Sequence, residues 1–561
     1  MIKTVIRLEF DYVFPDEEPK EVLEYLKKIS SFTLLNIIGF CNTYPQPNFD
    51  NFASNVEVHK DIVSRVIKFS RENKIPEKPI LVTREASLRL AEIILSNRDT
   101  LLANNTNDDR DTDEINLFKS FLVINTELNS KQNLTTAEDN LDKLVDMSLT
   151  MTFSTSDFDL FENNDSEFGK LVYATMVRFE YLIEFLKSSE EYEYLAKDLY
   201  NYFSQESLEE VFKQMKYLFG KLLELKVGNG YKFQVDDEKS IAFLDSIVSD
   251  EIIEDDDFTY LRNFPIYKIE KKVFAIIDFF FVVDKFYKSV KFILKNSFHK
   301  HHNLPQRDRS FFEFFNTHFS ENFLMSNVLE QIFDKPYFIK KDNLEDVPNE
   351  PDYYIRHNKK VFLFENKDVL IAKKIRSSGD INEINKVLKS KFLEVNNKPI
   401  GVGQLITSID QIVENQFKFD DYVNGKNNIT IYPILLINDR IFETLGVNFR
   451  LNQWYLEKIH EKLGEKYNSN LIKSLTVIDI DTLIYWTSYL KEKDSNFRRI
   501  IDEHLKAMSK KVKVNHPNIS KAKEIANKKL TKQIAPISNR LSNDIFPMKL
   551  LIKKFEDVIT N

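Results

Sequence analysis

The chain has 561 residues, of which 42% are hydrophobic and 29% charged, and its formal net charge is −9 at pH 7. This composition excludes a disordered chain. The single cysteine, Cys41, excludes intrachain disulfides and cysteine-based zinc or iron–sulfur sites. No signal-peptide core stands at the N-terminus, and the most apolar stretch, residues 273–283, is shorter than the about 20 residues that cross a bilayer. We therefore expect a cytoplasmic protein without a membrane partner.

The first half of the chain is predicted to be largely helical. Residues 1–96 form a mixed α/β region, in which IKTVIRLEF and PILVT are expected to be strands. Residues 97–305 form a mainly helical scaffold or sensing domain, because segments such as LVYATMVRFEYLIEFLK place apolar residues three and four apart. Residues 261–296 predict a small hairpin followed by a helix.

A different pattern begins near residue 306. Helical segments alternate with short apolar strands through residue 491, which predicts an α/β domain around a central mixed sheet. SLTVIDI is expected to be one strand of that sheet, and Asp481 is expected to cap the helix that follows it. Residues 492–561 form a basic helical C-terminal region. The expected fold class is therefore multidomain, with a helical half, an α/β domain and a helical tail.

Two carboxylates and a lysine are predicted to converge at the end of one hairpin. PDYYIR and KVFLFENK are two predicted strands joined by a tight turn at residues 357–359. Glu365 and Lys367 are two apart on the second strand, so their side chains point to one face. Asp352 begins the first strand, which folds back beside them. Charges at the end of an apolar strand are costly unless they are paired or metal-bound, and carboxylate oxygens suit Mg²⁺ or Mn²⁺. A surface salt-bridge cluster is the alternative interpretation.

The spacing of these residues matches a known motif. Pro351-Asp352, twelve intervening residues and then Glu365-Asn366-Lys367 resemble the motif of the PD-(D/E)xK nuclease superfamily, which has the restriction-endonuclease-like fold. The resemblance covers about residues 310–490. It implies that residues 306–491 are a nuclease domain, that Asp352 and Glu365 bind the metal, and that Lys367 completes the catalytic set.

The same family often adds a glutamate on the preceding helix and a glutamine on the following one. Glu321 and Glu330 are the candidates for the glutamate, and their spacing of nine residues places them on opposite faces of an α-helix. We prefer Glu321 because its face is otherwise apolar; an acid favoured by the helix dipole is the alternative. Gln404 matches the glutamine position, although Ser408 stands where a related form of the motif has tyrosine. An ordinary polar helix residue is the alternative for Gln404.

One segment of this acidic chain is strongly basic. Between Lys506 and Arg540 there are ten Lys or Arg residues and one acid, Glu524. Charge of one sign predicts contact with a phosphate backbone, and a solvated helix pair is the alternative. The lysines expected to bind nucleic acid are Lys506, Lys510, Lys511, Lys513, Lys521 and Lys523.

These features predict a nuclease that depends on Mg²⁺ or Mn²⁺ and hydrolyses phosphodiester bonds, with DNA as the expected substrate. By analogy, a large non-catalytic half suggests restriction or anti-phage defence, with a protein partner bound through that half or a homo-oligomer. Three alternatives stay open: an RNA nuclease, a nuclease fold that binds nucleic acid without turnover, and a helical interaction scaffold.

Overall fold

The computed structural model describes residues 6–39, 49, 52–75, 78–102, 109–131, 141–153, 165–249, 251–255, 257–342, 351–376, 378–512, 518–541 and 548–556. The chain forms two compact units, each assembled from segments that are distant in the sequence. The helical unit contains Lys3–Gln132, Leu186–Leu304 and Ile552–Asn561. The sheet unit contains Met1–Ile2, Asn133–Phe185 and Pro305–Leu551. The consecutive domain boundaries at residues 96, 305 and 491 stay predictions.

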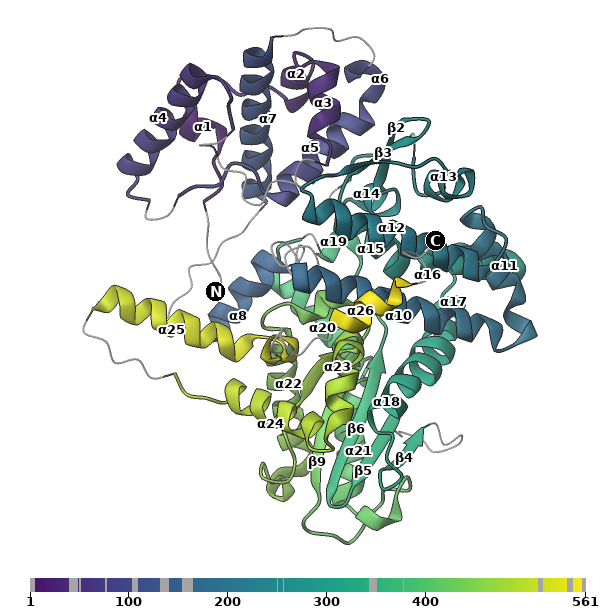
Figure 1. Cartoon of the computed structure of the whole chain (residues 1–561). Helices are drawn as coiled ribbons and strands as arrows, with labels where there is room; N and C mark the ends of the chain where they lie inside the picture. Colours follow the sequence, from purple (N-terminus) through teal and green to yellow (C-terminus); the bar gives the residue numbers. More distant parts are fainter. Residues whose placement is uncertain are drawn as a thin grey trace. The chain divides into compact units, whose positions relative to one another are not determined.

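The helical unit carries a small sheet among many helices (Figure 1). Its elements are α1 (Phe10–Val13), α2 (Val22–Leu26), α3 (Ser31–Ile37), α4 (Val56–Glu72), α5 (Arg84–Ser96), α6 (Arg98–Leu101), α7 (Arg110–Ser130), η3 (Glu190–Tyr192), α11 (Glu193–Tyr202), α12 (Leu208–Val227), β1 (Lys232–Gln234), α13 (Glu238–Asp245), α14 (Thr259–Asn263), β2 (Ile266–Glu270), β3 (Val273–Ile276), α15 (Phe279–Asp284), η4 (Lys285–Ser289) and α16 (Val290–His301).

The hairpin expected within residues 261–296 is confirmed, because β2 pairs antiparallel with β3 and a helix follows. The two strands expected near the N-terminus are wrong in the part of this region that the structure describes. There, Arg7 and Ile80 form only an isolated bridge. The chain turns into α1 at Phe10, so the ladder cannot extend past Glu9.

The sheet unit contains the predicted α/β arrangement. Its elements are α8 (Leu141–Thr152), α10 (Asp165–Lys187, which ends in the helical unit), α17 (Ser310–Phe314), η5 (Phe315–Met325), α18 (Ser326–Ile332), β4 (Ile339–Asp342), β5 (Tyr353–His357), β6 (Lys360–Lys367), α19 (Lys373–Arg376), α20 (Ile381–Phe392), β7 (Glu394–Val395), β8 (Lys398–Pro399), α21 (Val402–Val413), η6 (Asp421–Val423), β9 (Thr430–Ile437), η7 (Arg440–Glu443), α22 (Val447–Leu463), η8 (Gly464–Lys466), β10 (Thr476–Asp479), α23 (Ile480–Glu492), α24 (Asn496–Met508), α25 (Ile519–Ile534), η9 (Ile537–Arg540) and α26 (Met548–Lys554, which also ends in the helical unit).

The central sheet has five strands in the order β10-β9-β6-β5-β4. The strands β6, β9 and β10 run parallel, whereas β4 and β5 pair antiparallel, so the sheet is mixed as expected. Because parallel strands end at the same edge, the carboxyl ends of β6, β9 and β10 lie together. The N-terminal end of β5 reaches that edge too, because Tyr353 is paired with Phe364 near the end of β6.

Helices cover both faces of this sheet. Val361, Leu363 and Leu435 belong to a buried core shared with α20, α21 and α22. On the opposite face, the ring of Phe497 in α24 contacts Phe362 and Phe364. The continuous apolar run of β6 is therefore buried on both faces, and the charged Glu365 near its end is enclosed with it. In the described residues, no helix is long and apolar enough to cross a membrane.

Candidate active site

The hairpin of β5 and β6 brings together the three residues that the motif predicted. Glu365 and Lys367 continue the series of every second residue that begins with Val361 and Leu363. Their side chains therefore lie on the same face of β6 as those two residues. Asp352 directly precedes β5 and lies beside them. Lys367 Nζ is 3.1 Å from Glu365 Oε2 and 3.7 Å from Asp352 Oδ2. We call Asp352, Glu365 and Lys367 the hairpin site.

The three side chains differ in their access to solvent. Glu365 is 0% exposed, whereas the side chains of Asp352 and Lys367 are 12% and 19% exposed. The Oε1 atom of Glu365 is buried and has no hydrogen-bond partner among the described residues. The site therefore has a closed floor, formed by Glu365, and a rim, formed by Asp352 and Lys367, that solvent reaches.

The electrostatics of the site favour an added positive charge. Burial raises the pKa of Glu365 well above its usual value, and the neighbouring charge of Asp352 raises it further, while Lys367 opposes both effects. Burial acts to lower the pKa of Lys367, but the carboxylates of Asp352 and Glu365 outweigh it and raise that pKa. Both carboxyl groups can therefore be ionised together only with more positive charge than the one ammonium group supplies.

Glu321 acts on this site and Glu330 does not. The charge of Glu321 contributes to the raised pKa of both Glu365 and Lys367. Glu330 instead accepts a hydrogen bond from Tyr353 and pairs with Lys340. A role for Glu321 in catalysis stays a prediction, but the α-helical phase assumed for it is wrong, because Glu321 lies in the π-helix η5. Such π-helical turns often occur at functional sites.

A pair of hydrogen bonds ties η5 to the end of β6. Ser320 Oγ donates to Asp368 Oδ2 over 2.7 Å, and Asn316 Nδ2 donates to the Asp368 carbonyl oxygen over 2.9 Å. Asp368 directly follows Lys367. The residue next to Glu321 is therefore fixed to the residue next to Lys367, which holds η5 at the end of β6.

Gln404 lies at the start of α21 and has a local structural role. Its Oε1 accepts a hydrogen bond from the Gly401 backbone N–H over 2.7 Å, which caps the helix. Gly401 has φ +50°, and a Cβ added there would lie 3.4 Å from Lys367 Cε. Gln404 therefore contacts the residue that packs against Lys367; a role in contact with phosphate stays a prediction.

The hairpin site fits a divalent cation by its donor chemistry. In the described part of the chain, no three His, Cys, Asp or Glu side chains are gathered so as to hold a metal by themselves. Mg²⁺, however, commonly uses one or two carboxylates and takes its remaining ligands from water and substrate phosphate. The Oε1 atom of Glu365, which has no hydrogen-bond partner among the described residues, is an oxygen that such a cation would satisfy.

A second group of buried acids lies at the ends of β9 and β10, and sequence reasoning missed it as a cluster. We call it the arginine-paired cluster: Glu443, Asp479 and Asp481 with Arg178 and Arg440. Arg178 and Arg440 approach the two carboxylate oxygens of Asp481 to 3.2 and 3.4 Å. Burial, together with the charges of Asp481 and Glu443, raises the pKa of Asp479 well above its usual value. Burial raises the pKa of Glu443 to about 7.

The capping residue expected in this region is wrong by two positions. Asp479 is the N-cap of α23, and its side chain accepts a hydrogen bond from the Asp481 backbone N–H over 2.8 Å. Asp481 lies inside the first turn, where its side chain meets the two arginines instead. The sequence could not distinguish the two because Asp-x-Asp offers a capping oxygen at either position.

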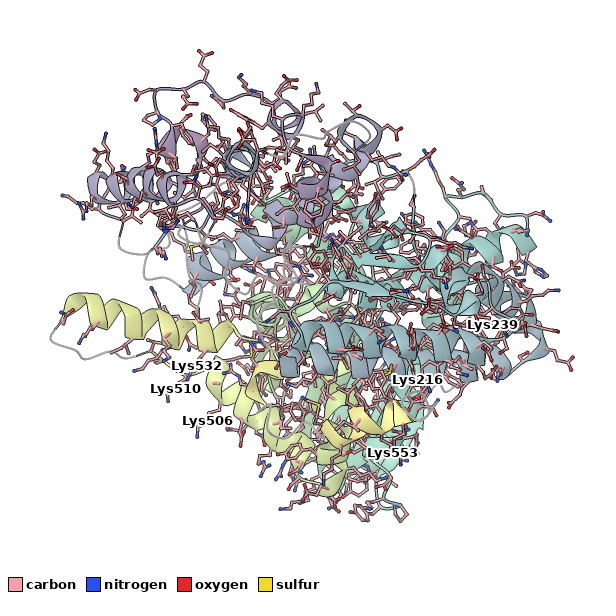
Figure 2. All side chains as sticks on the ribbon, turned by 45° about the horizontal axis from the view of Figure 1, so that its top comes forward. Lys216, Lys239, Lys506, Lys510, Lys532 and Lys553 are labelled. Atoms are coloured by element: carbon pink, nitrogen blue, oxygen red, sulfur yellow. The ribbon has the colours of Figure 1, made fainter. Side chains whose placement is uncertain are left out.

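The basic C-terminal segment places exposed lysines on α24, on the residues that follow it and on α25. Lys506, Lys510, Lys511 and Lys521 are exposed. Figure 2 shows Lys506 and Lys510 near Lys532 of α25, and α24 packs against α25. Lys513 and the side chain of Lys523 lie outside the described part of the structure.

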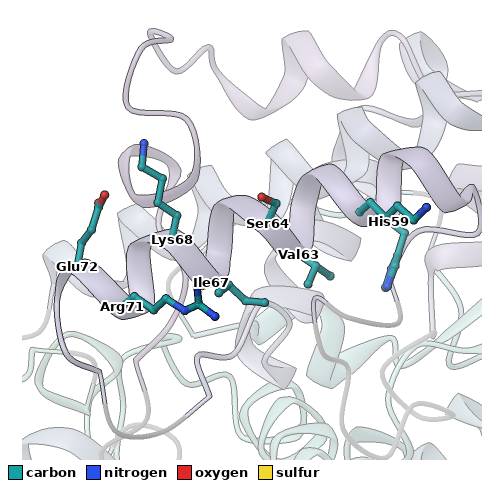
Figure 3. Close-up of a pocket in the computed structure, with 8 residues that line it drawn as sticks. His59, Val63, Ser64, Ile67, Lys68, Arg71 and Glu72 are labelled. Atoms are coloured by element: carbon teal, nitrogen blue, oxygen red, sulfur yellow. The ribbon is translucent and has the colours of Figure 1, made fainter.

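The helical unit has a hollow of about 700 Å³ along α4 (Figure 3). Its lining residues all belong to this one helix: His59, Lys60, Val63, Ser64, Ile67, Lys68, Arg71 and Glu72. A hollow bounded by one helix places no two chemical groups opposite one another. We therefore assign it no chemistry.

Comparison with known proteins adds no relative. No family model, no curated protein and no solved structure matches this chain. The geometry of the hairpin site is therefore the basis for proposing a function.

Proposed function

We propose that this protein is a nuclease that depends on Mg²⁺ or Mn²⁺ and hydrolyses phosphodiester bonds in DNA. The observation that carries the proposal is the convergence of Asp352 and Glu365 around Lys367 at the carboxyl edge of a mixed sheet. The match of these residues to the PD-(D/E)xK pattern gives the same expectation.

Each side chain has a role that its position supports. Asp352 and Glu365 would hold the ion, which would supply Lewis-acid polarisation of a phosphoryl oxygen and a water of lowered pKa. Lys367 would orient the attacking water and stabilise the negative charge that grows on the phosphate. The exposed lysines of α24 and α25 would bind the backbone of the substrate.

An assay of the purified full-length chain tests this proposal. Supercoiled DNA and single-stranded RNA are incubated separately with Mn²⁺, Mg²⁺ or a chelator, using the wild type, Lys367→Ala and Lys462→Ala. Lys462 is an exposed lysine paired with Asp410 at 3.2 Å, so its variant is a matched control. We expect metal-dependent cleavage of DNA by the wild type and by Lys462→Ala, but not by Lys367→Ala.

Other outcomes separate the alternatives. Cleavage of RNA but not DNA would support the proposed phosphodiester hydrolysis and identify RNA, instead of DNA, as the substrate. Binding without turnover would indicate a nucleic-acid-binding protein. Cleavage that persists in Lys367→Ala, or in the chelator, would contradict the proposal.

A further inference from the structure

The carboxyl ends of β6 and β9 are joined by a buried pair of amide side chains. Asn438 directly follows β9, and its Nδ2 donates a hydrogen bond to Asn366 Oδ1 over 2.7 Å. Asn366 and Asn438 are 4% and 3% exposed. Strand alternation turns the Asn366 side chain away from the face that carries Glu365 and Lys367. The amide pair therefore lies behind the hairpin site.

The main chain of Asn366 also holds a carboxylate of the hairpin site. Its backbone N–H donates to Asp352 Oδ2 over 2.7 Å. The strand β5 begins only at Tyr353. At the end of β6, the Asp352 side chain therefore accepts the hydrogen bond that a backbone carbonyl of β5 would otherwise accept. Asn366 is thus fixed to β9 by its side chain and fixes Asp352 by its peptide group.

We propose that Asn438 is a positioning residue which, through Asn366, holds the Asp352 carboxylate where it can share a divalent cation with Glu365. The proposal rests on the metal-dependent function proposed above. Without the Asn438 donor, the buried Asn366 oxygen loses this partner, and the end of β6 that orients Asp352 is held to β9 by backbone pairing alone. Residues that orient a metal ligand in this way usually change metal affinity by about 10–100-fold when they are removed.

Binding of Mn²⁺ alone, without nucleic acid, is the direct test. Free Mn²⁺ is measured by electron paramagnetic resonance in titrations of the wild type, Asn438→Leu and Asn448→Leu. Asn448 is a matched control, because it is equally buried and bonds the Leu475 carbonyl oxygen and the Val477 N–H on the sheet, at 3.2 and 3.3 Å. We expect Asn438→Leu to weaken Mn²⁺ binding by about 10–100-fold and Asn448→Leu to leave it unchanged.

A second variant and a second background show how the effect is transmitted. Asn366→Ala removes the acceptor of the same hydrogen bond, so it should weaken Mn²⁺ binding as Asn438→Leu does, even if one of the two variants folds poorly. In an Asp352→Asn background, Asn438→Leu should have no further effect, because the ligand that it positions is already gone.

The outcomes separate this inference from the proposed function. If the wild type does not bind Mn²⁺, both the proposed function and the role of Asn438 are contradicted. If the wild type binds Mn²⁺ and Asp352→Asn abolishes binding while Asn438→Leu and Asn366→Ala match the wild type, only the role of Asn438 is overturned. An equal loss in Asn448→Leu would also overturn it, since the effect would then be a general consequence of damage to the core.

Discussion

Two groups of buried acids lie at the same edge of the central sheet, and they have different partners. In the hairpin site, a single ammonium group stands between two carboxyl groups and keeps some contact with solvent. In the arginine-paired cluster, two guanidinium groups approach the two oxygens of Asp481, and the Asp481 side chain is almost fully enclosed. Both groups contain a carboxyl group whose pKa burial raises well above its usual value, Glu365 in one and Asp479 in the other.

A carboxyl group with a raised pKa therefore does not by itself identify a reactive site, because both groups contain one. Arginine keeps its charge permanently and presents several donors, so it can pair with a buried carboxylate without a metal ion. Lys367 supplies one charge for two carboxyl groups at a rim that solvent reaches. We therefore propose metal binding for the hairpin site and a structural role for the arginine-paired cluster.

The largest expected effect comes from replacing one buried acid in each group by its amide and measuring cleavage. Glu365→Gln should reduce metal-dependent cleavage by roughly 10³-fold, since a bound metal contributes several kcal/mol to such chemistry. Asp479→Asn should leave cleavage within a few-fold of the wild type. Single-turnover cleavage rates at saturating Mn²⁺ measure both. Equal losses in the two variants would abolish the distinction between the groups.

Stability against pH tests the structural role of the arginine-paired cluster. Because the pKa of Glu443 is about 7 in the folded protein and 4.5 in the unfolded chain, the folded state retains a proton that the unfolded chain releases. Stability should therefore fall as the pH rises from about 4.5 to 7. At pH 8, Glu443→Gln should raise the free energy of unfolding by up to about 3 kcal/mol. Urea denaturation at pH 5 and pH 8 measures this, and an equal gain at both values would contradict it.

We propose that Glu321 contributes to the hairpin site, and Glu330 provides its control. Glu321→Gln should lower the affinity for Mn²⁺ and the cleavage rate by roughly 10-fold, as for a group that adjoins metal ligands. Glu330→Gln should change neither, because its partners are Lys340 and Tyr353. The reverse ranking would place the wrong face of η5 over the site.

The smallest expected effect concerns access of the substrate to the hairpin site. Replacing Lys506, Lys510 and Lys511 by Gln should weaken DNA binding at every sequence and lower the salt slope by roughly 0.9 for each phosphate that is no longer neutralised. The control replaces Lys458, Lys462 and Lys466, which are paired with Glu394, Asp410 and Glu414. The affinity for DNA is measured at several salt concentrations for the wild type and both triple variants. An equal change in both triple variants would indicate only an effect of net charge.

The sequence was sufficient for the parts of the fold that depend on local pattern. The apolar runs of β6 and β9, the turn before Lys360 and the helices that follow were all predictable from periodicity. The spacing of Glu365 and Lys367 fixed their common face, because strand alternation is a local property of the backbone. Asp352 could be placed beside them because a tight turn leaves a hairpin few choices of register.

Tertiary structure decided the features that depend on distant segments. The union of residues 133–185 with residues 305–551 in one unit has no local signal. Neither does the contact of Arg178 with Asp481, 303 residues away. The π-helical phase of Glu321 and the bond from Asn438 to Asn366 arise where packed elements meet, since buried polar groups take whichever partner the assembled fold places within reach. The sequence by itself therefore determined which residues could form a site, and the packing of the sheet unit decided which of them are held together.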